Sequence, residues 1–299
     1  MKQLTFTLLL LLLTAALPLL AQSREVEQDL FEAMRSDEKA AVIAVHYGSA
    51  NGIAAIARFN EKLQAAFPQC TFREAWTCLP AIRQMNEQGQ TKQTLTHVLQ
   101  TLHAEGYTHV LIQPSSIFDG METAYIRHEA ETCQAKFKQL RIGSPLLSEP
   151  ADYEEAIRLA AKHYGQKKVA NVLVAGGEDC ENPAQFAMLD YMLRLLGYND
   201  WLVVAEDGFP TTEQLLKLLK QRKQKKVHLI PFTFATASEQ NIGQLRQTLQ
   251  KAGYKVTTGT QPMGQLDDII SLFVSHAQHA RLYRTYSQLE LKMQEALGN

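Results

Sequence analysis

The amino-acid sequence predicts an α/β protein with two similar lobes, each a parallel sheet with helices on both faces. Three observations support this prediction. Short apolar runs rich in valine, isoleucine and leucine alternate with longer segments of helical periodicity. The same order of strands and helices occurs twice, with a period of about 120 residues, which is typical of duplicated domains. Glycine and polar residues follow the apolar runs, as they do in parallel α/β sheets.

The first half alternates strand and helix after a polar segment, residues 24–37, that we predict to be helical. Residues 41–45 form an unbroken apolar run typical of a buried strand. The segment 53–67 places its apolar side chains on one helical face. Further strands are predicted at 71–76, 109–113 and 140–143, and further helices at 91–105 and 120–138.

The second half repeats this order. Strands are predicted at 169–174, 201–205, 227–231 and 255–257, and helices at 183–196, 212–221 and 239–252. We therefore expect a signal peptide at 1–21, an N-terminal lobe at 40–147, a connecting helix at 148–168, a C-terminal lobe at 169–265 and a C-terminal helix at 266–299.

The N-terminus has the pattern of a secretory signal. Lys2 precedes an apolar stretch, residues 4–21, that ends in Ala21 before polar residues. Cleavage after Ala16 and an uncleaved anchor are the alternatives, and the first cysteine, Cys70, is too distant for a lipoprotein signal. The sequence therefore predicts an exported protein, in the periplasm or associated with the cell surface, that has no membrane span once the signal is cleaved.

Composition excludes several classes of protein and partner. With 45% hydrophobic and 20% charged residues, the chain is neither disordered nor fibrous. A net charge of -1 provides no overall attraction to nucleic acid or to an anionic membrane. The sequence leaves open whether the chain forms a homo-oligomer. It also leaves open whether its four cysteines, which we expect to be thiols, form disulfides: Cys70, Cys78, Cys133 and Cys180.

Ligands of parallel α/β sheets bind beyond the carboxyl ends of the strands, so we expect the site in a cleft between the lobes. In the first half these positions are His46, Tyr47, Gly48, Ser49 and Ser116, and in the second Gly176, Gly177, the 178–181 run, Glu206 and Glu239. An imidazole and carboxylates suit divalent metals such as Fe, Co, Ni or Zn. Solvated loop residues are the alternative for most of these positions. The chain has no dinucleotide fingerprint or Walker loop, so no nucleotide cofactor is expected.

Five short segments show a resemblance to a known family. They are 141–147 (Arg-Ile-Gly-Ser-Pro-Leu-Leu), 152–153 (Asp-Tyr), 189–190 (Leu-Asp), 227–231 (Val-His-Leu-Ile-Pro) and 272–276 (Leu-Phe-Val-Ser-His). In this order and spacing they resemble the anaerobic-type sirohydrochlorin cobalt chelatases, the single-subunit, ATP-independent class II enzymes, over residues 40–282. The resemblance implies two flavodoxin-like lobes with the tetrapyrrole between them.

The family's metal site, two histidines and a glutamate, is carried over only in part. The glutamate matches Glu206. One histidine falls on Gly176 and the other on Glu239, so the chain has lost the first and changed the second to a carboxylate. The resemblance then implies that Glu206 binds the metal and accepts protons, with Glu239 or with His46 from the facing lobe. We expect the glycines, Tyr47, Ser49 and Ser116 to contact the ring.

Three functions follow as hypotheses. The first is a chelatase that inserts Co²⁺ or Fe²⁺, as substrate, into sirohydrochlorin or a related porphyrin. The second is an exported carrier of haem or another tetrapyrrole that has lost insertion chemistry, which the signal sequence and the missing histidines favour. A hybrid of the two would remove iron from captured haem. The third is a generic two-lobed solute-binding protein.

Overall fold

The protein is described from a computed structural model that covers residues 24–32, 34–48, 52–176, 183–205, 208–235, 239–259 and 261–286. The chain divides into two compact units, a large one spanning 34–280 and a small one that takes in the described residues before and after it. The predicted signal peptide at 1–21, Cys180 and the 178–181 run lie outside the described residues.

The small unit is a two-stranded antiparallel sheet in which β1 (Arg24–Glu27) pairs with β10 (Tyr283–Tyr286). Arg281 donates two hydrogen bonds, of 2.9 and 2.7 Å, to the carboxylate of Asp29, and its guanidinium lies over the Phe31 ring. The predictions of a helical segment at 24–37 and of a helix through 266–299 are therefore wrong at these strands. Each strand forms its sheet hydrogen bonds with a partner more than 250 residues away in the chain. Local periodicity in the sequence cannot predict such a distant pairing.

Two four-stranded parallel sheets make up the large unit, with the orders β3-β2-β4-β5 in lobe 1 and β7-β6-β8-β9 in lobe 2. This confirms the predicted α/β class and the repeated strand order. The strands are β2 (Ala40–His46), β3 (Thr71–Trp76), β4 (His109–Pro114), β5 (Gln139–Ile142), β6 (Ala170–Ala175), β7 (Trp201–Ala205), β8 (Lys226–Phe232) and β9 (Lys255–Thr258).

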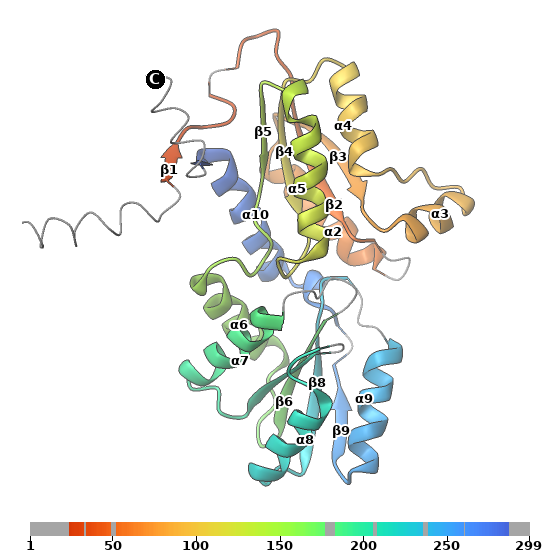
Figure 1. Ribbon diagram of the computed structural model, residues 1–299, viewed down its shortest axis with the longest axis vertical. Helices are drawn as coiled ribbons and strands as arrows, with labels where there is room; N and C mark the ends of the chain where they lie inside the picture. The colour runs from red at the N-terminus through yellow and green to blue at the C-terminus, as the bar shows by residue number, and fades with distance from the viewer. Residues whose placement is uncertain are drawn as a thin grey trace, which may run out of the picture. The chain divides into compact units, whose positions relative to one another are not determined.

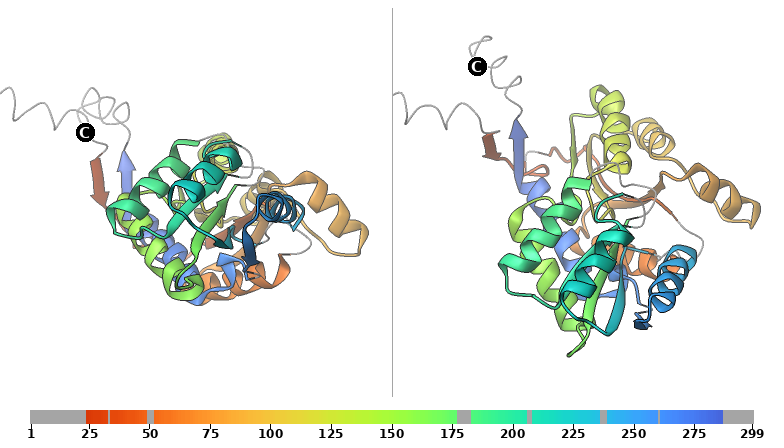
Figure 2. Two further views of the ribbon diagram at one scale, coloured as in Figure 1. Left: turned by 90° about the horizontal axis from the view of Figure 1, so that it is seen from below. Right: turned by 60° about the horizontal axis from the view of Figure 1, so that its bottom comes forward.

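Helices cover both faces of each sheet, as parallel strands require (Figures 1 and 2). The helices are α2 (Ile53–Ala66), α3 (Leu79–Glu87), α4 (Leu95–Ala104), α5 (Met121–Cys133), α6 (Pro150–Tyr164), α7 (Pro183–Leu195), α8 (Thr212–Gln221), α9 (Glu239–Lys251) and α10 (Asp267–Leu282), with 3₁₀ turns η2 (Gln134–Lys136) and η3 (Met263–Gln265). One continuous apolar cluster joins α4 and α5 to the lobe 1 sheet, and another joins α8 and α9 to the lobe 2 sheet.

The last helix, α10, is bonded to elements from both halves of the chain. Asp267 pairs with Arg58 and Lys62 on α2, and Asp268 pairs with Lys162 on α6. These contacts draw the C-terminal helix against the first helix of lobe 1 and against the predicted connecting segment, which is helical only over 150–164. Helix α3 was not predicted.

Three of the four cysteines lie in the described residues. Cys70 and Cys133 are buried and Cys78 is half-buried. Within the described part of the chain, no helix is long and apolar enough to cross a bilayer.

Candidate functional site at the carboxyl ends of the strands

At the carboxyl ends of the two sheets, each lobe packs a phenylalanine side chain against phenylalanines of the other lobe. Phe234, just after β8 of lobe 2, lies 5.5 Å from Phe59 and 5.6 Å from Phe273, measured between ring centroids. In the opposite direction Phe118, after β4 of lobe 1, packs 4.8 Å from Phe186 and 5.9 Å from Phe232. The described strand ends of the two lobes are therefore brought to a common region.

A pair of hydrogen bonds reinforces this meeting of the strand ends. The backbone N–H of Asp119 donates to the side-chain oxygen of Gln185 at 3.0 Å, and the Gln185 amide donates back to the Asp119 carbonyl. Gly52 approaches Ala235 so closely that a Cβ at residue 52 would lie 2.5 Å from the alanine Cβ. Only glycine fits there without displacing the loop after β8.

His46, the last residue of β2, is buried with an exposed fraction of 1%. Its Nδ1 lies 2.9 Å from the Ser115 hydroxyl and its Nε2 lies 2.8 Å from Oδ1 of Asn60. The Asn60 amide donates to Glu74 at 2.6 Å, so its oxygen faces the histidine and accepts from Nε2–H. Nδ1 is then the acceptor of the Ser115 hydroxyl. The imidazole is neutral, because burial lowers its pKa to about 4 while the bond to Asn60 only partly opposes this.

The predicted metal ligand His46 has no ring nitrogen that is without a hydrogen-bond partner in this geometry. Both ring nitrogens are already bonded, and the Phe234 ring is stacked over the imidazole at 6.3 Å. A metal ion could reach the ring only if the histidine released Ser115 or Asn60. In this arrangement His46 is a buried structural residue.

The network continues to a carboxylate that the sequence analysis did not single out. Glu74 accepts from the Trp76 indole at 2.6 Å and from Lys92 at 2.5 Å, and the Lys92 ammonium also lies 4.7 Å from the Trp76 ring centroid. Burial opposes ionisation of Glu74, but the bond from Lys92 and the other positive partners outweigh it and lower its pKa. The sequence feature that could have pointed to this network is Asn60, a polar residue beside the apolar face of its helix.

Two of the predicted substrate contacts in lobe 1 have structural roles. Gly48 has φ of 94°, and a Cβ there would lie 2.1 Å from the Trp76 ring, so only glycine fits. Ser116 is buried and donates to Glu122 at 2.6 Å. Tyr47 is half-buried and its carbonyl accepts from Cys78 N–H. Ser49 lies outside the described residues.

In lobe 2 the strands β6 and β7, which precede predicted site positions, end side by side. Ala175 and Ala205, the last residues of β6 and β7, are partners in the sheet register, and Gly176 and Glu206 are the next residues in the chain. Glu206 and Gly177 lie outside the described residues, as does the side chain of Glu239, whose backbone begins α9. Across the part of the chain with described side chains, no three His, Cys, Asp or Glu residues form a group able to hold a metal ion.

Gly176, on which the resemblance places one of the family's histidines, has a backbone conformation that favours glycine. Its φ is 130°, a region that residues with a Cβ rarely adopt. A histidine at this position would be strained at this φ.

Two other histidines in the large unit are bonded to partners of their own. His276 on α10 lies 3.0 Å from the Asp152 carboxylate, and this ion pair outweighs burial and raises the pKa of the imidazole. His228 on β8 lies 2.9 Å from the Thr257 hydroxyl. Neither faces the strand ends that carry the predicted site.

The fold and this edge define a two-lobed parallel α/β protein of the chelatase type. The family model described as "Cobalt chelatase (CbiK)" matches residues 40–281, and the chain belongs to this family. The sirohydrochlorin cobaltochelatase of Salmonella typhimurium is 26% identical over 229 residues, which cover 73% of this chain and 86% of that protein. Sirohydrochlorin cobaltochelatase CbiKC of Nitratidesulfovibrio vulgaris is 22% identical over 252 residues, 80% of this chain and 89% of the relative.

Solved structures confirm the two-lobed chelatase fold. SirB from Bacillus subtilis with Fe³⁺ superposes with a TM-score of 0.60 at 16% identity, over 81% of this chain and 96% of SirB. The multi-domain protein DR2241 from Deinococcus radiodurans, described as structurally similar to chelatases, matches with a TM-score of 0.57 at 14% identity, over 87% of this chain and 60% of DR2241. The family match makes a generic solute-binding protein the weakest of the three hypotheses.

Proposed function

We propose that this protein is a tetrapyrrole metal chelatase that inserts Co²⁺ or Fe²⁺ into sirohydrochlorin or a related porphyrin. The observation that carries the proposal is the family match, which runs through both lobes from residue 40 to residue 281. Two relatives that match most of their own length are sirohydrochlorin cobaltochelatases. We place the reaction beyond the carboxyl ends of β6, β7 and β8, where Glu206 and Glu239 occur in the sequence.

Insertion exchanges two pyrrole N–H bonds for metal–nitrogen bonds, so two protons must pass to bases. Glu206 and Glu239 supply carboxylate oxygens that can hold the incoming divalent ion and accept these protons. An ordinary glutamate has a pKa near 4.3, about two units below that of histidine, so it is the weaker base at neutral pH. We expect a slower chelatase than one with the full pair of family histidines.

The test is an absorbance assay with purified protein, sirohydrochlorin and Co²⁺ or Fe²⁺. Insertion should exceed the protein-free rate, and Glu206→Gln should abolish the excess, because the amide neither binds the ion as strongly nor accepts a proton. Glu213→Gln is the matched control, since Glu213 is an exposed carboxylate in the first turn of α8. Equal rates with and without protein would refute catalysis.

A second candidate is a carrier that binds haem or another tetrapyrrole without inserting metal. Two observations favour it. Gly176 adopts a backbone conformation suited to glycine where the family has histidine, and His46 has both nitrogens bonded. A shift of the Soret band on binding haem, with no change in metal content of any ring, would establish the carrier. Release of free iron from bound haem would instead identify the reverse reaction.

We also propose that the chain is exported to the periplasm, supported by Lys2 and the apolar stretch 4–21. Cell fractionation combined with the mass of the mature N-terminus tests this. Cleavage after Ala21 or Ala16 supports export, and an intact N-terminus in the cytoplasmic fraction contradicts it.

A further inference from the structure

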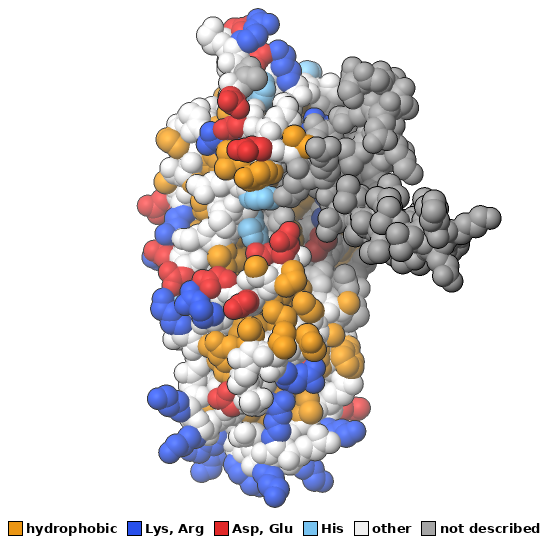
Figure 3. All heavy atoms as spheres, turned by 90° about the vertical axis from the view of Figure 1, so that its left-hand side faces the viewer, with side chains coloured by type: hydrophobic (Ala, Val, Ile, Leu, Met, Phe, Trp, Pro, Cys, Tyr) orange, Lys and Arg blue, Asp and Glu red, His pale blue; other side chains and the backbone are white. Residues whose placement is uncertain are grey.

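The amino end of the lobe 2 sheet gathers lysines from three separate segments of the chain. In a parallel α/β lobe the helices run opposite to the strands, so helix C-termini and strand starts share one edge. We call these exposed residues the basic edge: Lys167, Lys168, Lys220, Lys223, Lys225, Lys226, Lys251 and Lys255. Figure 3 shows basic side chains gathered at this end of the molecule.

The basic edge is not neutralised by the protein. Within the described residues, no carboxylate forms an ion pair with any of its lysines, whereas the exposed cations Arg58, Arg158 and Lys162 all have acidic partners. Lys226 and Lys255 are even register partners on neighbouring strands. Like charges in that position repel each other and reduce stability.

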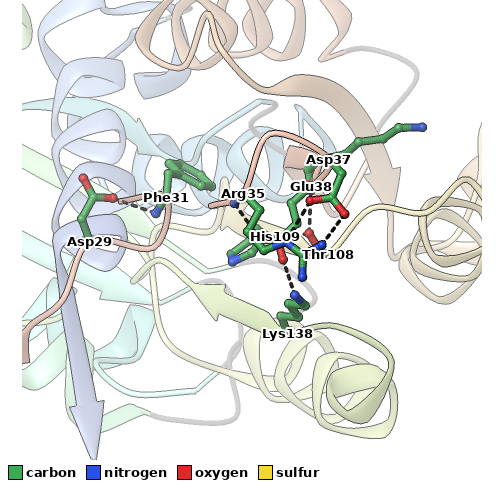
Figure 4. Close-up of polar contacts among 9 residues, drawn as sticks. Asp29, Phe31, Arg35, Asp37, Glu38, Thr108, His109 and Lys138 are labelled. Carbon is green, nitrogen blue, oxygen red and sulfur yellow. Dashed lines mark hydrogen bonds and ion pairs between the residues drawn. The ribbon is translucent and has the colours of Figure 1, made fainter. Parts of the chain in front are cut away.

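The corresponding edge of lobe 1 shows the contrast. Lys138, just before β5, pairs with the carboxylate of Glu38, which also accepts from Arg35 N–H and lies 3.9 Å from His109 (Figure 4). The hydrogen bond from Lys138 is the main reason that the pKa of Glu38 is lowered. At this edge of the sheet, lobe 1 therefore pairs a lysine with a carboxylate, whereas lobe 2 accumulates positive charge.

Helix dipoles account for only part of the basic edge. Lys220 and Lys251 lie in the last turns of α8 and α9, where cations are favourable. Lys225 and Lys226 lie at the start of β8, and the Lys167–Lys168 pair lies in the turn before β6, outside any helix. Because the whole chain has a net charge of -1, the rest of the molecule carries a compensating excess of acid.

The chemistry of the basic edge indicates the kind of anionic partner. Its charges are lysine ammoniums, and the nearby Arg222 guanidinium already donates to the backbone carbonyls of Asn199 and Trp201 at 2.7 and 3.2 Å. The basic edge is therefore a set of lysine point charges rather than the arginine forks that read base edges in nucleic acids. Lysine point charges suit a diffuse anionic surface. Leu195, at the C-terminal end of α7, is 63% exposed on the same side of the sheet and can enter a lipid interface.

We propose that the basic edge docks lobe 2 on the anionic surface of a phospholipid membrane. The strands run from this edge to the carboxyl ends that carry the candidate site, about 20 Å away for a strand of six residues. Docking therefore leaves the site facing away from the lipid. The proposal depends on the charge distribution of the described residues and stands whether the protein is a chelatase or a carrier.

The test is co-sedimentation of the full-length chain with vesicles of phosphatidylcholine alone or with one third phosphatidylglycerol. The neutral vesicles measure any binding by the apolar N-terminal stretch, so the readout is the increment that anionic lipid adds. Each lysine near an anionic surface contributes roughly a fivefold gain, so Lys223→Gln, Lys225→Gln and Lys255→Gln together should reduce the increment roughly 100-fold. Added salt should reduce it as well.

The control triple variant has the same change in net charge elsewhere: Arg83→Gln, Lys136→Gln and Arg246→Gln, all at exposed positions. It should retain nearly all of the anionic increment. An equal loss in both triple variants, or no increment in the wild-type protein, would overturn the proposal. Tighter binding to duplex DNA at the same phosphate concentration, lost in the basic-edge variant, would also overturn it and assign the surface to nucleic acid.

Discussion

Replacing Asn60 by alanine tests the buried network that holds His46. Among the described residues, the substitution removes the only oxygen that accepts from His46 Nε2–H, at 2.8 Å, and it leaves that donor buried. Glu74 keeps its bonds from Lys92 and Trp76, so the cost falls mainly on the histidine. An unsatisfied buried donor costs about 1–3 kcal/mol, and we expect Asn60→Ala to lower the free energy of unfolding by this amount.

The assay is urea unfolding of a double-mutant cycle with His46→Phe, which has no ring N–H. In that background Asn60→Ala should cost less, and the coupling energy should be about 1–2 kcal/mol with an unchanged m-value. A coupling energy within about 0.3 kcal/mol of zero would refute the bond and the tautomer assigned to it. If Asn60→Ala instead accelerates metal insertion, the released His46 is a metal ligand and its structural role is wrong.

Three further predictions concern pH, chemistry and backbone. The pKa of His46 is about 4 in the folded protein and near 6.5 in the unfolded chain, so the unfolded state binds the proton at higher pH. The free energy of unfolding should therefore fall by up to roughly 3 kcal/mol as the pH drops from about 6.5 to 4. Urea titrations of His46→Phe should lack this pH-dependent component. Glu239→His should raise the rate of Co²⁺ insertion several-fold and move the pH-rate inflection toward 6.5, while an unchanged profile would exclude residue 239 as a base. Gly48→Ala should lower the free energy of unfolding, measured by heat or urea, by at least about 2 kcal/mol, because its Cβ would overlap the Trp76 ring. Gly89→Ala should lower it less, because residue 89 has a φ of 83° but open space around it, so only backbone strain is added.

The strand and helix order was predictable because it is encoded locally. Runs such as Ala40–His46 are buried on both faces of a parallel sheet and so read as continuous apolar segments. The strands β1 and β10 were not predictable, since neither Arg24–Glu27 nor Tyr283–Tyr286 has a local pattern that names its distant partner. Helix α3 was missed because it is only nine residues long and carries Pro80 in its first turn.

The sequence predicts where the candidate site lies, and less of the role of each residue in it. The rule that ligands bind beyond strand ends selects the edge where Phe118 and Phe234 bring the two lobes together. It could not show that His46 is bonded on both sides, because Ser115 and Asn60 come from other elements of the fold. A residue's availability depends on its three-dimensional neighbours, and those are set by packing.

The sequence by itself determined the α/β class, the duplicated lobes, the chelatase family and the region of the candidate site. These features depend on local periodicity and on motifs with fixed spacing. Only the tertiary structure decided which side chains are free to act and where charge accumulates. The net charge of -1 predicted no overall attraction to anionic surfaces, yet folding brings lysines from three segments to one edge of lobe 2, because parallel topology places helix C-termini and strand starts together.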